Sequence, residues 1–323
     1  MPETPDIGRR FRRALVTGGA GFIGSHLIDE LLAQGLEVVC VDDFSSGYHS
    51  NLEHHAGNPR LRIAKCDIAD GVALAEQFEG VDVVFHNAAC KKTLSLLTPT
   101  RDVDTNVKGT LNVILLSRDH GVQKIVIAST GSVYGEAVQC PQSEDHPLQP
   151  VSLYGIDKLA GESIARLYAR RDNLDISVLR YFHVYGPRQE SGRHGGVIAI
   201  FCASLLHGES PTIYGDGTQQ RSFTYVGDIV RANLLVALHA RSKGGMYNCA
   251  SGLKITVGEM YEALAAIAGR PGLKPRYGPW TEGDIKIFDV SNERIRALGM
   301  TAWTPFAEGL QRTFQWFRDR SRV

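Results

Sequence analysis

Residues 14–24 read Ala-Leu-Val-Thr-Gly-Gly-Ala-Gly-Phe-Ile-Gly, and this stretch decides the fold. The apolar residues at its start predict the end of a buried strand, and Gly18, Gly21 and Gly24 then permit a tight turn into a helix. Gly18 allows the turn without a Cβ penalty, Gly21 lets a pyrophosphate approach the backbone, and Gly24 lets the helix pack closely on the strand. The N–H groups at the start of such a helix attract phosphate.

The next apolar run, residues 36–41, ends at Asp42 and Asp43. A carboxylate at position 42 accepts hydrogen bonds from an adenosine ribose and repels a 2′-phosphate, which favours NAD over NADP. A lone Gly-x-Gly-x-x-Gly is weak evidence, because a purely structural glycine-rich turn also contains it. The order of strand, turn, helix, strand and Asp42 is much more specific and predicts an NAD site.

Length and composition limit the class of protein. The 323 residues carry a formal net charge of zero, so nothing indicates a nucleic-acid or anionic membrane surface. No apolar run reaches membrane-spanning length. His54-His55 falls in a polar segment and is interpreted as surface, so no metal site is predicted. Free thiols in a cytoplasmic protein are predicted, because no Cys-x-x-Cys pair occurs among Cys40, Cys66, Cys90, Cys140, Cys202 and Cys249.

Short apolar strands alternate with amphipathic helices in the first half of the chain. Strands are predicted at 13–17, 36–41, 61–65, 81–86, 123–128 and 175–180, and helices at 22–34, 70–79, 100–120 and 153–171. This rhythm predicts an α/β fold with a doubly wound parallel sheet, the Rossmann arrangement, covered by helices on both faces.

After about residue 181 the pattern changes to short strands rich in Gly and Pro, which predicts a smaller C-terminal α/β substrate domain. A helix at 228–240 and a strand at 245–249 favour a return to the first domain. The predicted NAD-binding domain is therefore 12–180 plus about 226–250, and the substrate domain is 181–225 plus 251–318. Residues 1–11 are expected to form a flexible tail.

Tyr154 and Lys158 are spaced so that both lie on one face of a helix. The lysine charge is expected to lower the pKa of the phenol, so that a phenolate becomes accessible near neutral pH. Upstream, a predicted strand ends in Ser129-Thr-Gly-Ser132, where a hydroxyl can bind a substrate oxygen. Tyr-x-x-x-Lys alone is also common on ordinary helix surfaces, and the NAD motif is what favours the catalytic interpretation.

These motifs resemble the extended short-chain dehydrogenase/reductase family, and within it the NAD-dependent nucleotide-sugar epimerases and dehydratases. The resemblance covers about residues 13–318. It rests on Thr17-Gly-Gly-Ala-Gly-Phe-Ile-Gly24, Val41-Asp-Asp-Phe-Ser-Ser-Gly47, Cys66-Asp-Ile68, Phe85-His-Asn-Ala-Ala89, Asn106-Val-Lys-Gly-Thr110, Ser129-Thr-Gly-Ser-Val-Tyr-Gly135, Tyr154-x-x-x-Lys158, Arg180-Tyr-Phe-His-Val-Tyr-Gly186 and the segment 214–225.

The resemblance implies a role for individual residues. Catalytic roles fall on Thr130, Tyr154 and Lys158. Cofactor contacts are implied for Gly18, Gly21, Phe22, Ile23, Gly24, Asp42, Asp43, Phe44, Ser45, Asp67, Ile68, Ala88, Ala89, Lys91, Asn106, Tyr154, Lys158 and Phe182. Substrate contacts are implied for Thr130, His183, Gly196, Val197, Tyr214, Arg221, Asp284 and Phe288.

Three departures from the family pattern bear on substrate. His183 stands where the family usually has Asn, and Thr281 stands where it has an arginine that binds diphosphate. Lys91-Lys92 doubles a position that usually holds one lysine; the extra cation either recognises a carboxylated sugar or lies on the surface. Phe288 aligns with the residue that limits bulk at the sugar C2 position, which disfavours N-acetyl sugars.

The family's shared first step is hydride abstraction at sugar C4. Gly131 and Ser132 stand where 4,6-dehydratases carry Asp-Glu, and the decarboxylases usually carry Glu at position 132. The resemblance therefore implies a nucleotide-sugar 4-epimerase, with UDP-hexose as substrate and NAD retained. A dehydratase, decarboxylase or reductase using the same 4-keto chemistry is the alternative, and a non-catalytic NAD-binding regulator is an alternative of another class. Related enzymes form homodimers by pairing two helices of each chain into a four-helix bundle.

Overall fold

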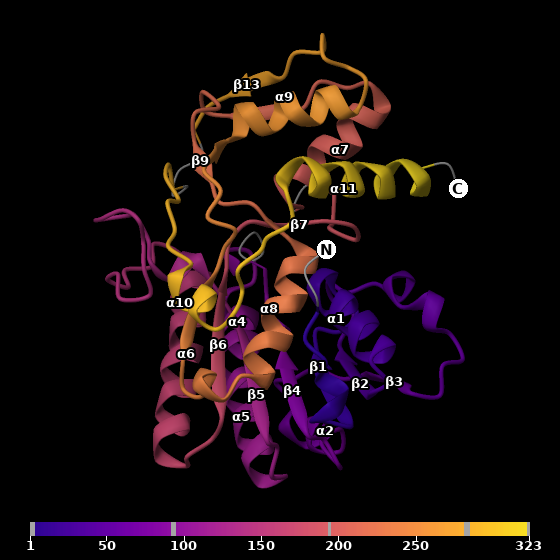
Figure 1. The fold of residues 1–323 in the computed structure, drawn as a ribbon, viewed down its shortest axis with the longest axis vertical. Helices are drawn as coiled ribbons and strands as arrows, with labels where there is room; N and C mark the ends of the chain where they lie inside the picture. The colour runs from indigo at the N-terminus through magenta and orange to yellow at the C-terminus, as the bar shows by residue number, and fades with distance from the viewer. Residues whose placement is uncertain (1–3, 92–94, 193–194, 281–284, 322–323) are drawn as a thin grey trace.

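The computed structural model describes residues 4–91, 95–192, 195–280 and 285–321. Its centre is a sheet of seven parallel strands in the order β11-β6-β5-β4-β1-β2-β3 (Figure 1). The strands are β1 (Arg13–Thr17), β2 (Glu37–Asp42), β3 (Leu61–Lys65), β4 (Val83–His86), β5 (Lys124–Thr130), β6 (Ile176–Tyr181) and β11 (Met246–Cys249). Each lies close to a predicted strand, so the doubly wound parallel sheet is confirmed.

Helices cover both faces of this sheet, because successive residues of each strand point to opposite sides. Val16 and Cys40 belong to the core shared with α1 (Phe22–Ala33) and α8 (Val226–Leu238). Their neighbours Leu15 and Val39 belong to the core on the other face. That second face is covered by α2 (Gly71–Ala75), α5 (Thr110–Asp119) and α6 (Leu153–Arg171).

The helix predicted over 100–120 is interrupted. It consists of α4 (Pro99–Val103), a wider π-helical stretch η4 (Asp104–Gly109) and then α5. The wider turn places the Asn106 side chain in the interior, where it bonds the backbone of the loop after β4. Such widened turns often occur at functional sites. The predicted helix 70–79 is also shorter in the structure, as α2.

The later part of the chain forms a second, smaller group of elements, in the upper half of Figure 1. Its helices α7 (Val197–His207), α9 (Val257–Ile267) and α11 (Phe306–Arg320) share one apolar core. Short strands pair around them: β7 (Val184–Tyr185) with β10 (Thr224–Tyr225), β8 (Thr212–Tyr214) with β13 (Arg276–Gly278), and β9 (Gln220–Arg221) with β12 (Ile255–Thr256). The remaining short helix, α10 (Glu293–Ala297), packs beside β11.

The N-terminal segment corrects an expectation. Residues 1–11 were expected to be a free tail, but the described part of it, from residue 4, packs on the sheet. A short turn, η1 (Ile7–Arg9), buries Ile7 and Phe11 completely in the core beside α1 and α8. The Ile7 amide also donates to the side chain of Gln34, 2.7 Å away. Burial of these two apolar side chains therefore holds the segment on the fold, although many of its other residues are polar.

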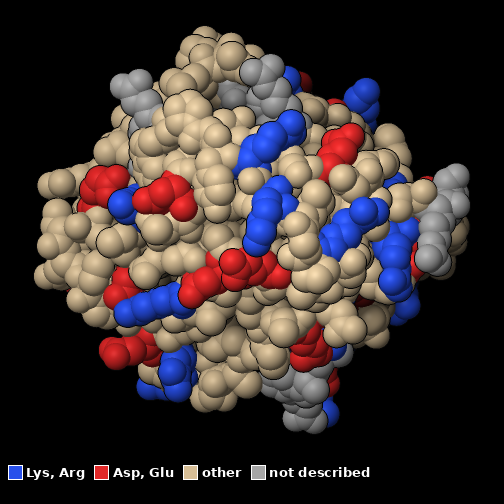
Figure 2. All heavy atoms as spheres, turned by 90° about the horizontal axis from the view of Figure 1, so that it is seen from above, with Lys and Arg blue, Asp and Glu red and all other residues tan. Residues whose placement is uncertain are grey.

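Charge on the surface is mixed in sign. On the face seen from above in Figure 2, Lys and Arg alternate with Asp and Glu without a large area of one sign. Among the residues described, no helix combines the length and the apolarity needed to span a bilayer.

Candidate active site

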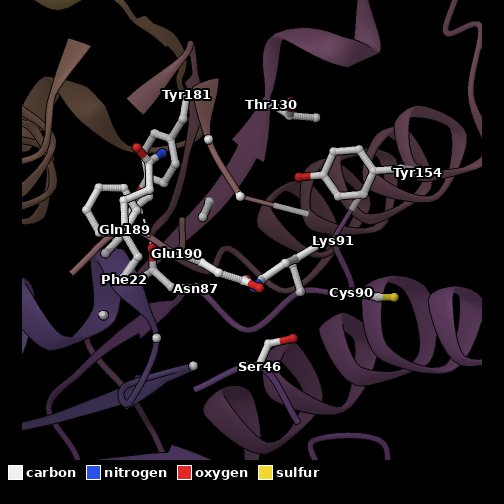
Figure 3. A pocket seen from close by; sticks show the side chains of 18 of the residues that line it. Phe22, Ser46, Asn87, Cys90, Lys91, Thr130, Tyr154, Tyr181, Gln189 and Glu190 are labelled. Atoms are coloured by element: carbon white, nitrogen blue, oxygen red, sulfur yellow. Dashed lines mark hydrogen bonds and ion pairs between the residues drawn. The ribbon is translucent and has the colours of Figure 1, made fainter. Parts of the chain in front are cut away.

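One cavity of about 830 Å³ opens at the carboxyl ends of β1, β2, β4, β5 and β6 (Figure 3). Ligands of doubly wound sheets bind at this edge. The predicted site residues that line it are Gly18, Gly21, Phe22, Ile23, Gly24, Asp42, Asp43, Ser45, Asp67, Ile68, Ala88, Ala89, Lys91, Thr130, Tyr154, Lys158, Phe182, His183, Gly196, Val197, Tyr214, Arg221 and Phe288. Asp284, like Lys92 and Thr281, lies outside the described residues.

The glycine-rich turn has the geometry that its sequence predicts. Gly18 has φ +66°, and a Cβ there would lie 2.7 Å from the Ala88 amide nitrogen. A Cβ on Gly24 would lie 2.1 Å from the Gly18 carbonyl oxygen. Gly21 is the N-cap of α1 and has no side chain with which to occupy the first N–H groups of the helix. The turn therefore presents a helix start to the cavity, as a phosphate group requires.

Asp42 fixes this turn from the adjacent strand. Its Oδ2 accepts from the Ala20 amide at 2.9 Å, and its Oδ1 accepts from the Phe44 amide at 2.8 Å. Burial raises the pKa of this carboxyl, although the two amide hydrogen bonds oppose the shift. A carboxylate oxygen can accept more than one hydrogen bond, so Asp42 can hold the turn and still receive a ribose hydroxyl.

Two residues predicted to contact the cofactor do not line the cavity. The Phe44 ring stacks on His49, with the centroids 3.8 Å apart, and only its backbone reaches Asp42. Asn106 is buried behind the wall, where its Oδ1 accepts from the Cys90 amide at 3.1 Å. Both residues therefore support the cofactor wall from behind.

The catalytic candidates come together from two elements. Thr130 ends β5, and Tyr154 and Lys158 lie on the first turns of α6, whose N-cap Ser152 accepts from the Gly155 amide. Both hydroxyls line the same cavity, and Thr130 Oγ1 donates to Ser132 Oγ at 3.3 Å and accepts from the Ser132 amide at 3.1 Å. In Figure 3 the Tyr154 hydroxyl points into the cavity. The arrangement presents one phenol and one aliphatic hydroxyl to a single substrate oxygen.

The expected lowering of the Tyr154 pKa does not occur in the polypeptide by itself. Loss of solvent raises the pKa of the phenol to about 12, and the influence of Thr130 only partly opposes this. Burial also lowers the pKa of Lys158 to about 8, against the attraction of Glu162 and Asp102. Burial therefore outweighs the lysine charge, and a second positive charge is needed for a phenolate near neutral pH.

The opposite wall is aromatic and carries a guanidinium. The His183 and Phe288 rings meet edge to face, 4.7 Å apart, and Arg221 lies over Phe288 at 5.5 Å. Gly196, the N-cap of α7, lies beside them, so this helix also starts at the cavity. A second helix start together with a guanidinium forms a second place where an anionic group can bind.

Comparisons with known proteins agree with this geometry. The sequence pattern of the NAD dependent epimerase/dehydratase family matches residues 14–250. The chain belongs to this family. It is 38% identical to the UDP-glucose 4-epimerase of Mycolicibacterium smegmatis over 316 residues, covering 96% of this chain and all of the relative.

Two further similarities show the range of this family. The crystal structure of UDP-glucose 4-epimerase from Thermotoga maritima with UDP-glucose superimposes with a TM-score of 0.89 at 37% identity, covering 96% of this chain and 99% of the other. UDP-glucuronic acid decarboxylase 1 of Arabidopsis thaliana is 34% identical over 327 residues, covering 97% of this chain and 72% of the relative. The sequence therefore places the chain among NAD enzymes that act on nucleotide sugars.

NAD is the cofactor of this epimerase/dehydratase family, and the cavity fits it. Gly18, Gly21 and Gly24 leave room at the start of α1 for the pyrophosphate, and Asp42 stands where a ribose is bound. Tyr154 and Lys158 lie on the side of the cavity formed by α6, where the reactive ring and the sugar would meet.

Several residues that line the cavity were not predicted from the sequence. Arg101 of α4 lines the cavity and pairs with Asp43 at 2.7 Å, and Tyr181 ends β6 beside Asn87. Gln189 and Glu190 also line it, from the loop after β7. The segment Tyr185-Gly-Pro-Arg188 marks a turn in the sequence, but nothing local shows that the turn leads into the cavity.

Proposed function

We propose that the protein is an NAD-dependent nucleotide-sugar 4-epimerase that acts on a UDP-hexose. Support comes from the two uncapped helix starts in one cavity, at α1 and α7, which suit one pyrophosphate of the cofactor and one of the substrate. The hydroxyls of Thr130 and Tyr154 between them suit an alcohol group of the sugar. The relatives named UDP-glucose 4-epimerase agree with this assignment.

In the proposed reaction, Tyr154 takes the proton of the C4 hydroxyl, while Thr130 orients that oxygen. Bound NAD supplies the hydride acceptor and a positive charge beside the phenol. Lys158, whose pKa is lowered to about 8 by burial, still carries positive charge at neutral pH and adds to this field. Tyr154 then returns the proton to the C4 oxygen; NAD, when bound, would return the hydride to the opposite face of a 4-keto sugar that has rotated in the cavity.

The residues that follow Thr130 favour epimerisation over dehydration or decarboxylation. Gly131 packs so closely that a Cβ there would lie 2.3 Å from Cε1 of the Phe182 ring. A dehydratase carboxylate at position 131 would therefore displace the ring. Ser132 donates its backbone N–H to Thr130 Oγ1 and accepts from the same hydroxyl through its own Oγ. An acid–base pair for moving water or a carboxyl group is thus missing from this strand end, and hydride return is the outcome that remains.

The proposal is tested with the protein as isolated, without added cofactor. UDP-glucose, UDP-glucuronate, UDP-N-acetylglucosamine and dTDP-glucose are incubated separately, and the anomeric and C4 protons are followed by NMR. We expect UDP-glucose to yield a mixture of C4 epimers of unchanged mass. Loss of water or carbon dioxide would assign the protein to the dehydratases or decarboxylases. Stoichiometric consumption of reduced nicotinamide would assign a reductase, and bound NAD without turnover would assign a regulator.

The proposed enzyme is a cytoplasmic homodimer. Cytoplasm is supported by the cysteines, which are all free thiols. Val113 on α5 is fully buried in the core of its own chain, whereas Leu167 on α6 is 55% exposed. Ile156 and Val103 add exposed apolar side chains on α6 and α4. These helices therefore offer a surface that a second copy can cover.

A further inference from the structure

Three side chains with metal-binding groups meet outside the cavity. Asp29 lies on α1, and His54 and His55 lie on η3 (Glu53–His55), a short turn after β2. The Nε2 atoms of both imidazoles lie 2.8 Å from the same oxygen, Oδ1 of Asp29. The two rings are tilted against each other with their centroids 4.1 Å apart. Two adjacent histidines therefore converge on one point.

The carboxylate in this cluster is held from behind. Arg188, from the loop after β7, donates to Oδ2 of Asp29 at 2.7 Å, which leaves Oδ1 directed at the imidazoles. Carboxylate ligands of metals are commonly oriented in this way by a second group.

We propose that Asp29, His54 and His55 form a binding site for a divalent cation of the zinc class. Two imidazole nitrogens and one carboxylate oxygen are ligands that zinc takes, with bonds of about 2.0–2.2 Å. Tetrahedral ligands at that bond length stand about 3.3 Å apart. The three ligand atoms here lie within 4.8 Å of one another, so small side-chain movements bring them into place.

The surroundings leave room for the rest of the coordination shell. The side chain of His54 is 44% exposed and that of Asp29 is 30% exposed, so water can reach the cation and complete the shell. His26, on the same helix, bonds the Phe22 carbonyl at 2.9 Å through Nδ1, and burial together with Arg188 lowers its pKa to about 4. It is therefore neutral and adds no positive charge against a metal ion.

The site lies apart from the reaction but fixes two segments together. Asp29, His54 and His55 do not appear among the described residues that line the cavity, although Arg188 does. A bound cation would replace the two N–H bonds to Oδ1 with coordination bonds and hold η3 on α1. Binding to the folded state alone raises stability by mass action. The metal is therefore a structural clamp, and the reaction itself does not need it.

The test uses the full chain with its bound NAD and without a histidine tag. Zinc chloride is titrated calorimetrically, Co²⁺ is followed by its visible absorption, and the melting temperature is measured with and without Zn²⁺. We expect one cation per chain and a higher melting temperature. The double variant His54→Ala/His55→Ala is expected to lose more than about tenfold in affinity, since even a lost second-shell partner costs that much.

Two controls separate this cluster from other ligands. His207→Ala removes an exposed histidine far along the chain, and Cys140→Ser removes the exposed thiol, so both should bind as the unchanged protein does. Equal zinc affinity of the double variant and the unchanged protein would overturn the proposal. Loss of binding in Cys140→Ser would also overturn it, because the thiol would then be the site. A folded double variant is shown by its unchanged turnover.

Discussion

Lys91 and Glu190 form an ion pair across the cavity, although 99 positions separate them in the chain. Lys91 follows β4 and Glu190 follows β7, and Figure 3 shows the two side chains meeting inside the cavity. Lys91 of the doubled lysine therefore lines the cavity, whereas Lys92 lies outside the described residues, and both interpretations of the extra cation stay predictions. A substrate entering this space meets a cation whose charge is already balanced by a carboxylate.

Glu190→Gln should change the choice between charged and neutral sugars. Without its carboxylate partner, Lys91 is available to a sugar carboxylate. We expect kcat/KM for UDP-glucuronate to rise relative to that for UDP-glucose by up to about fivefold, since a partly exposed ion pair contributes about 1 kcal/mol at most. The ratio is measured by NMR with both substrates. Lys91→Met is the matched control and should shift the ratio the other way; an unchanged ratio in both variants would contradict this role.

Tyr154→Phe should remove catalysis while leaving the cofactor site intact. The phenol is the proposed proton acceptor, and loss of a general base costs about 10²–10⁴-fold in turnover. We expect this loss in UDP-glucose epimerisation, with the amount of NAD released on denaturation unchanged. Tyr168→Phe, on the same helix and stacked with Arg171, removes a phenol hydroxyl elsewhere and should leave turnover unchanged. Activity retained by Tyr154→Phe would show that another group is the base.

A buried pair of carboxyls lies next to the catalytic residues. Asp102 is fully buried and accepts from Ser95 Oγ at 2.5 Å and from Asn106. Asp157 is 5% exposed and lies near enough to Asp102 for the charge of that carboxylate to act on it. Burial, followed by the charge of Asp102, raises the pKa of Asp157 to about 6. Asp157 therefore binds a proton at a higher pH than an ordinary aspartate does.

This pair predicts how stability depends on pH. The folded state holds the Asp157 proton more tightly than the unfolded chain, whose carboxyl has the ordinary value of 3.8. Stability therefore falls as the pH rises from about 4 to about 6, by about 2–3 kcal/mol. Asp157→Asn should remove this fall. In urea denaturation at several pH values, the free energy of unfolding of the variant should therefore rise relative to that of the unchanged protein as the pH increases. Asp319→Asn, an exposed site, should show a constant difference. A constant difference for Asp157→Asn as well would refute the assignment.

The sequence predicted the sheet because buried parallel strands are nearly continuous apolar runs, and residues such as Val39 and Cys40 need no long-range information to be recognised. The glycine-rich turn was equally predictable from the sequence, since the positive φ at Gly18 and the close packing at Gly24 allow few residues other than glycine. The break at Asn106 was not predicted, because the apolar spacing runs through it. A single extra residue in one turn changes which side chain points inward without changing the pattern.

The missed features of the site all depend on tertiary structure. The approach of Glu190 to Lys91 joins segments from the two parts of the chain, and no local pattern encodes it. The convergence of His54 and His55 on Asp29 likewise requires that η3 fold back on α1. The raised pKa of Tyr154 in the polypeptide by itself could not be predicted, because charge spacing can be read from a sequence but loss of solvent cannot.

Phe288→Ala should widen the choice of sugar. The ring is 6% exposed and packs against Phe182 and His183 at the substrate wall. Removing it opens space for an N-acetyl group, so we expect turnover of UDP-N-acetylglucosamine to rise relative to UDP-glucose. A Phe→Ala change in a core also costs about 3–5 kcal/mol of stability, so both substrates are assayed well below the melting temperature of the variant. Phe288→Leu should give an intermediate ratio. Equal turnover of both sugars by the unchanged protein would refute this role.

Leu167→Glu should separate the proposed dimer. Leu167 is 55% exposed on α6, so a charge there costs little in the isolated chain, whereas burying it without a partner at a helix–helix interface is unfavourable. We expect light scattering after size exclusion to give twice the mass of one chain for the unchanged protein and the mass of one chain for Leu167→Glu. Val72→Glu, at a valine on α2 that is 82% exposed, is the control and should stay dimeric. A dimer that survives Leu167→Glu with an unchanged dissociation constant would place the interface on another surface, and α6 would then require a different explanation for its exposed apolar residues.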